Sequence, residues 1–219
     1  MCGCGASTLP AGATERQEQE GVAIAEFTIV GHRFRIPKAY LTQKGDMAGR
    51  TPKDWGDAVF MRGLMPDIHP LVTKHEKEHY RGGKELREVV SFGIWSRHGV
   101  KFMGPDPYFF KDETLKNCAK AGKGYRVCPP ENPYRKETRE YFVREDTDGR
   151  FVFRCTKLGS APSPHCYIKL PLIDDVELKI GFQRKHFSRK EEIIKRVKSI
   201  VCGYWVPDPN RTLNINHCK

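Results

Sequence analysis

The stretch YFVREDTDGRFVFRC, residues 141–155, decides the fold class. Apolar and charged residues alternate on both sides of Asp-Thr-Asp-Gly at 146–149, which is typical of a β-hairpin with one buried face. Residues 166–170 and 176–182 repeat this alternation, and Asp174-Asp175 has the composition of the turn between them. We therefore predict two antiparallel hairpins in one sheet.

An amphipathic helix is predicted after the second hairpin. Its apolar residues recur at helical spacing: Ile193, Ile194, Val197, Ile200 and Val201. Ser188 and Glu191 have the spacing of a capping box at its start. The helix should pack on the sheet, so the predicted fold class is α+β: an antiparallel sheet built from β-hairpins with a C-terminal amphipathic helix, stapled by disulfides.

Upstream of residue 100 the pattern indicates further strands. Residues 25–30 and 33–37 alternate around Gly31-His32, so we expect a tight turn there with His32 at the surface. Residues 58–64 and 86–95 are also strand candidates. A long loop is expected at 41–57, and the polar segment 69–81 is a candidate short helix, with His69 at the surface.

The chain of 219 residues is 38% hydrophobic and can bury one sizeable core. We predict a flexible tail over 1–20, which resembles the mature end of a lipoprotein, and a single α+β domain over 21–219. Residues 104–137 hold five of the fifteen prolines, so they are expected to form an irregular excursion stapled by a disulfide.

The chain has eight cysteines and no Cys-x-x-Cys pair, a pattern that favours disulfides over a zinc site. Six body cysteines allow fifteen pairings. We choose nearest neighbours, Cys118–Cys128, Cys155–Cys166 and Cys202–Cys218, because short loops close with little rearrangement and each would stabilise by about 3 kcal/mol. The expected compartment is oxidising; the alternative is buried free thiols in a cytosolic protein.

The N-terminus, Met1-Cys2-Gly3-Cys4-Gly5, resembles the mature end of a bacterial lipoprotein. That resemblance implies a lipid on Cys2 and a periplasmic location at the bacterial envelope. The alternative is a disordered start to a soluble protein. No apolar run approaches eighteen residues, so no transmembrane helix is predicted.

A formal net charge of +11 suits an acidic protein partner, an anionic lipid surface or nucleic acid. The cations are scattered among 27 acidic residues and no nucleic-acid-binding signature is present, so nucleic acid is disfavoured. An envelope protein that binds anionic lipid surfaces is a third functional class, which salt-dependent vesicle binding would identify.

One segment, His75-Glu76-Lys77-Glu78-His79, matches the H-E-x-x-H pattern of zinc hydrolases. In that alternative, His75, His79 and Glu85 bind zinc and Glu76 is the base. The charged residues within and around the motif provide no apolar face to bury, so we prefer a polar surface helix turn. With no other catalytic motif in the chain, we predict no catalytic residues, no metal and no cofactor.

Three segments together resemble the periplasmic immunity proteins of bacterial type VI secretion systems. They are Gly31-His32-x-Phe34-x-Ile36-Pro37-Lys38-x-Tyr40-Leu41, Arg62-Gly63-Leu64-Met65-Pro66-Asp67, and the final hairpin followed by a helix. The group that protects against phospholipase effectors is the most similar. This resemblance implies a non-enzymatic inhibitor that binds a secreted antibacterial toxin, of lipase or phospholipase type, and occludes its active site.

A phospholipase cleft that attracts anionic head groups would repel a basic inhibitor, so this hypothesis requires acidic residues on the docking face. The preferred candidates for partner binding lie in the stapled excursion: Asp106, Tyr108, Phe109, Phe110, Asp112 and Glu113. The alternative acidic set is Glu145, Asp146 and Asp148 in the hairpin turn.

Overall fold

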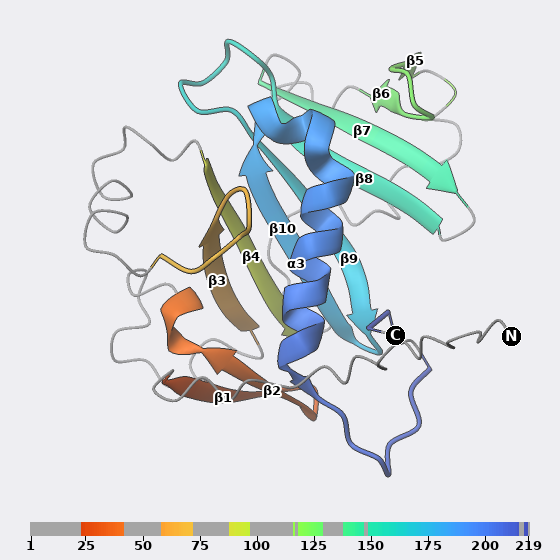
Figure 1. Ribbon diagram of the computed structural model, residues 1–219. Helices are drawn as coiled ribbons and strands as arrows, with labels where there is room; N and C mark the ends of the chain where they lie inside the picture. Colours follow the sequence, from red (N-terminus) through yellow and green to blue (C-terminus); the bar gives the residue numbers. More distant parts are fainter. Residues whose placement is uncertain are drawn as a thin grey trace, which may run out of the picture.

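The structure, a computed structural model of the chain, describes residues 23–41, 58–71, 88–96, 116, 118–128, 138–146, 149–214 and 217–218. It is an α+β fold of two antiparallel sheets with a C-terminal helix, α3 (Lys190–Tyr204), which confirms the predicted class (Figure 1). A 3-10 helix, η6 (Arg184–Arg189), leads directly into α3.

The larger sheet has eight strands in the order β3-β4-β10-β9-β8-β7-β6-β5. Their bounds are β3 Ala58–Leu64, β4 Val89–Ser96, β5 Ala119–Lys120, β6 Arg126–Cys128, β7 Arg139–Asp146, β8 Gly149–Thr156, β9 His165–Ile173 and β10 Val176–Gln183. Both predicted hairpins are present as β7–β8 and β9–β10. Asp174 and Asp175 form the turn of the second, as predicted.

The main core lies between one face of this sheet and α3, which crosses that face in Figure 1. Ile193, Val197 and Val201 are fully buried, and Ile194 and Ile200 pack against the core, so the predicted apolar stripe is confirmed. The sheet contributes the alternate residues of its central strands: Phe92, Ile94, Phe153, Ile168, Leu170, Leu178, Ile180 and Phe182. Burying each large apolar side chain stabilises the fold by about 1.5–3 kcal/mol.

The predicted capping box at the start of the helix is wrong. Ser188 lies inside η6, and α3 begins after Arg189, whose side chain makes no capping hydrogen bond. Because the 3-10 turn runs straight into the α-helix, its carbonyl groups accept the first backbone hydrogen bonds of α3 and no side-chain cap is required.

A smaller sheet, β1 (Ile24–Ile29), β2 (His32–Pro37) and β11 (Trp205–Val206), packs its inner face on the same core. Its tight turn is Val30-Gly31, where both residues have positive φ, and not Gly31-His32. With the turn one residue earlier, His32 is the first residue of β2, and strand alternation places it on the inward face with Phe34 and Ile36. His32 therefore lies inside with only 3% exposure, and the surface position predicted for it is wrong.

Buried His32 adjoins the β9–β10 turn. Its Nε2 lies 3.5 Å from a carboxylate oxygen of Asp174, and the Asp174 carboxylate also accepts a 2.8 Å hydrogen bond from the backbone of Asn214. Burial lowers the pKa of His32, Arg211 lowers it further, and Asp174 opposes the shift. The turn thus joins the small sheet to the C-terminal segment.

The stapled part of the predicted irregular excursion is regular in the structure. Residues 119–128 form the short hairpin β5–β6, which extends the large sheet beside β7. Strands of two and three residues are too short to show an alternating pattern, which is why the sequence did not reveal them. Tyr125 anchors the hairpin: its ring packs on Phe153 and Phe187, and its hydroxyl donates to Glu191 over 3.2 Å.

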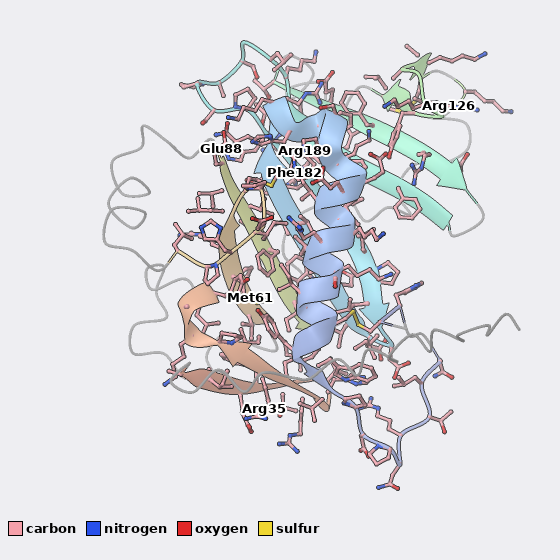
Figure 2. The ribbon with its side chains drawn as sticks, in the orientation of Figure 1. Arg35, Met61, Glu88, Arg126, Phe182 and Arg189 are labelled. Atoms are coloured by element: carbon pink, nitrogen blue, oxygen red, sulfur yellow. A yellow bond between two sulfur atoms is a disulfide. The ribbon has the colours of Figure 1, made fainter. Side chains whose placement is uncertain are left out.

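All three predicted disulfides are present: Cys118–Cys128, Cys155–Cys166 and Cys202–Cys218. The first encloses the β5–β6 hairpin, the second joins cross-strand neighbours of β8 and β9, and the third ties α3 to the C-terminal segment. Figure 2 shows how far this scaffold reaches, with Arg35 of β2 and Arg126 of β6 at distant ends of the fold.

Candidate functional site

Most of the residues predicted to have a functional role lie outside the described part of the chain, so those assignments stay predictions. They are Cys2, His75, Glu76, His79, Glu85, Asp106, Tyr108, Phe109, Phe110, Asp112, Glu113 and Asp148. Of the alternative acidic set, Asp146 ends β7 and Glu145 is exposed beside it. The described residues include no cluster of three or more His, Cys, Asp or Glu able to hold a metal.

The described residues with the most distinctive chemistry lie on the face of the large sheet opposite α3. Side chains alternate along each strand, so the neighbours of core residues point to this second face. We call Trp95, Arg154, Tyr167, Lys169 and Lys179 the cation–aromatic face. They come from four adjacent strands, β4, β8, β9 and β10.

The cations of this face lie over its aromatic rings. The Lys179 amino group is 5.1 Å from the ring centre of Tyr167 and 5.6 Å from that of Trp95. Lys169 lies 5.5 Å from Trp95, and Arg154 lies 5.6 Å from Tyr167. Each such contact holds a long cationic side chain in place by about 0.5–1 kcal/mol or more when water is excluded.

The two lysines face each other directly across β9 and β10. Among the described residues, no carboxylate forms an ion pair with either amino group. The nearby Glu177 carboxylate accepts a 3.2 Å hydrogen bond from the Trp95 indole. Burial, and then the charges of Arg154 and Lys169, lower the pKa of Lys179. Like charges at directly opposed positions cost stability, and an anionic partner would remove that cost.

Glycine at position 181 is required for this arrangement. A Cβ atom built on Gly181 would lie 2.7 Å from the Tyr167 ring and from the Ser91 hydroxyl. The tyrosine ring can therefore lie against the β10 backbone only because position 181 lacks a side chain. The packed ring in turn supports Lys179 and Arg154 from below.

Sequence reasoning placed these residues in strands but did not bring them together. Tyr167, Lys169 and Lys179 look like the solvent side of two alternating strands, and Trp95 lies more than seventy residues before each of them. The sequence feature that could have indicated this face is the presence of Trp95 and Tyr167 at outward positions of strands that also carry lysines at outward positions. Only the register of β4, β9 and β10 shows that these side chains meet.

Replacing Lys169 by glutamine should raise the pKa of Lys179 toward its ordinary value, because one of the three causes of its lowering is removed. Burial is the largest cause, so the recovery should be partial. The check is an NMR titration of the lysine ε-carbons, with Lys120→Gln on the distant β5 as the matched control. An unchanged Lys179 pKa would contradict the arrangement.

The same shift has a consequence for stability. Since the folded state lowers the pKa of Lys179, it disfavours the charged form. Stability of the wild type relative to Lys179→Gln should therefore increase as the pH rises from the lowered pKa toward the ordinary lysine value. Urea unfolding of both proteins across this pH window measures the difference, and a decrease over the window would oppose it.

No helix in the described part of the chain is long and apolar enough to cross a membrane. No protein-family model and no curated protein matches the sequence. A solved structure has a similar fold: an immunity protein of the Stenotrophomonas maltophilia type IV secretion system superimposes with a TM-score of 0.54 and 14% identity, covering 84% of this chain and 94% of that one. At this identity the likeness shows a common fold.

Proposed function

We propose that this chain is an immunity protein that binds and neutralises a secreted antibacterial toxin without catalysing a reaction. The observation that carries the proposal is the fold shared with a secretion-system immunity protein over 84% of the chain. The resemblance noted from the sequence alone supports the same class of protein. The disulfides favour an oxidising compartment, and the proposed location is the periplasm, with lipid attachment through Cys2.

The physical properties of the described residues suit a binding protein. Three disulfides and two sheets around a common core make a rigid scaffold, and rigidity reduces the conformational entropy lost when partners associate. Lys169 and Lys179 of the cation–aromatic face form no ion pair with a described carboxylate, so this face is complementary to an acidic surface on the toxin. An acidic protein partner would therefore explain the lysines of this face, and binding to nucleic acid is not needed to explain them.

Finer features of the proposal come from the sequence resemblance. They are a type VI secretion system, a toxin of lipase or phospholipase type and occlusion of its active site. The similar solved structure is described as part of a type IV system, which supports the immunity class and not a particular system. In this proposal the cation–aromatic face would meet an acidic region of the toxin beside the active site that the chain occludes.

A competition experiment between sibling strains tests the proposal and needs no purified toxin. Host cells lacking this chain should be killed in contact with sibling cells that retain every secretion system. Wild-type chain exported to the periplasm should restore their survival, whereas the same chain kept in the cytosol should not. Equal survival of the deletion strain and its parent, under conditions where the siblings kill unrelated bacteria, would refute the proposal.

A further inference from the structure

The loop between β8 and β9, residues 157–164, presents a large apolar side chain to solvent. Leu158 is 71% exposed; among the described residues, Ile24 at 38% is the other large hydrophobic side chain that is exposed. A single exposed leucine is common on protein surfaces and proves nothing alone. What distinguishes Leu158 is how firmly its loop is held.

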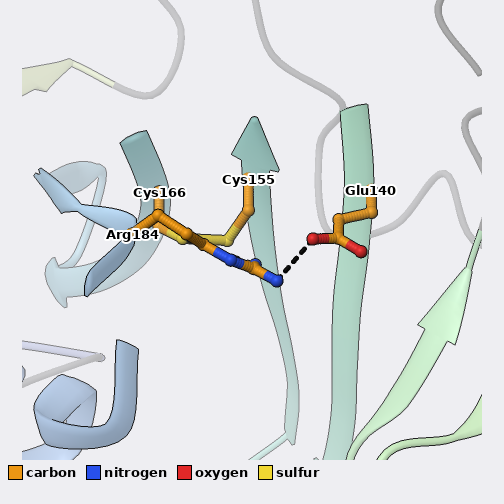
Figure 3. The surroundings of a disulfide bond; sticks show 4 residues. All are labelled: Glu140, Cys155, Cys166 and Arg184. Atoms are coloured by element: carbon orange, nitrogen blue, oxygen red, sulfur yellow. Dashed lines mark hydrogen bonds and ion pairs between the residues drawn. A yellow bond between two sulfur atoms is a disulfide. The ribbon is translucent and has the colours of Figure 1, made fainter. Parts of the chain in front are cut away.

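The base of the loop is closed by the Cys155–Cys166 disulfide. Figure 3 shows Arg184 beside this disulfide, with its guanidinium reaching Glu140 on β7 to form an ion pair from which water is largely excluded. The Arg184 side chain also lies 4.4 Å from the ring centre of Phe142. The backbone N–H of Arg184 donates to Pro164 over 2.8 Å, which fixes the far end of the loop.

Hydrogen bonds also order the inside of the loop. The Ser160 hydroxyl donates to the carbonyl oxygen of Lys157 over 2.8 Å and folds the chain around Leu158. The Gln183 amide donates to the Ser163 hydroxyl over 2.9 Å. The backbone N–H of Lys157 donates to Thr138 over 2.9 Å. A loop held in this way has already lost the conformational entropy that binding would otherwise cost.

Two cationic residues lie close to the leucine in the sequence or across the adjoining strand pair. Lys157 precedes it, and Arg139 is the cross-strand neighbour of Thr156. No described carboxylate forms an ion pair with either side chain. On the other side, the His165 ring stacks on Tyr167 at 6.3 Å, so the loop continues directly into the cation–aromatic face. The end of the loop therefore adjoins the cation–aromatic face.

We propose that Leu158 inserts into an apolar pocket of the toxin whose rim is acidic. This inference rests on the proposed function and deepens it by naming the contact. A preordered apolar side chain at the tip of a loop, with the cations Lys157 and Arg139 nearby, is complementary to such a pocket, and a few buried anchor residues supply most of the affinity of an interface.

The test measures how much exported chain is needed for half-maximal survival of deletion cells among their siblings. Leu158→Asp should raise that amount by at least about thirtyfold, the factor expected from losing one interface anchor. The matched control is Ile24→Asp, which introduces the same charge at the other exposed aliphatic residue and should leave the amount unchanged. Circular dichroism and thermal melting establish that both variants fold.

The outcomes separate the two proposals. If wild type and Leu158→Asp protect equally, the contact is wrong while the immunity function stands. If the wild-type chain fails to protect the deletion cells, the immunity function and the Leu158 contact are both refuted. Should Leu158→Asp fold poorly, Leu158→Ser must show the same loss. Sedimentation of the purified chain adds a final check: a wild-type dimer that Leu158→Asp dissociates would assign the leucine to a second copy and overturn the inference.

Discussion

Truncating Phe153 to alanine should lower the free energy of unfolding by about 3–5 kcal/mol, the cost of removing a phenyl ring from a packed core. Phe153 is 1% exposed. Its ring lies 5.4 Å from Phe187, 6.0 Å from Tyr125 and 6.3 Å from Phe182, so it contacts η6, the β5–β6 hairpin and β10 at once. Urea unfolding followed by fluorescence measures the loss.

The control for this prediction is Phe151→Ala, on the same strand. Phe151 is only partly buried and packs at the margin of the core, under the Arg144 guanidinium. Its truncation should cost clearly less, because less apolar surface returns to water. If both variants lose the same free energy of unfolding, the contacts of Phe153 with Phe187, Tyr125 and Phe182 contribute no more to stability than the partly buried Phe151 does.

Replacing Cys155 and Cys166 together by alanine should destabilise the protein by about 3 kcal/mol, since the unfolded chain regains the freedom of a short closed loop. It should also loosen the β8–β9 loop. We expect faster amide hydrogen exchange at residues 157–164 and weaker protection of deletion cells, because Leu158 would no longer be held ready for its partner.

The Cys118–Cys128 disulfide provides a matched control. Its cysteines are 10 residues apart, against 11 for Cys155 and Cys166, so the entropic contribution of the two bridges is nearly the same. Cys118→Ala with Cys128→Ala should therefore reduce stability by a similar amount but leave exchange in the β8–β9 loop unchanged. If both double variants loosen that loop alike, the loop's order depends on global stability and not on its own disulfide.

Local patterns were enough to predict the parts of the fold that depend on neighbouring residues. The hairpins around 146–149 and 174–175, the stripe from Ile193 to Val201 and the three disulfides all join positions close in sequence. Alternation, helical spacing and short loop closure are each local properties of the chain. Those predictions agree with the structure for this reason.

Predictions failed, or could not be made, where distant residues decide the outcome. His32 was assigned to the surface because it was counted as a turn residue, whereas β2 begins at His32, on the inward face that Phe34 and Ile36 pack against the core. The contact between Lys179 and Trp95 depends on β10 pairing with β4, which no local pattern indicates. The cation–aromatic face was therefore not predicted.

The place of β10 in the sheet also determines the order in which the protein can fold. β4 ends at Ser96, yet β10, its neighbour on one side, begins at Val176. Until the last third of the chain is present, β4 has only β3 beside it, and its other edge is open to pairing with another molecule. Closing the sheet requires contacts between distant residues, so we expect folding to be slow and to finish after synthesis, with the unfilled β4 edge as the point of greatest aggregation risk.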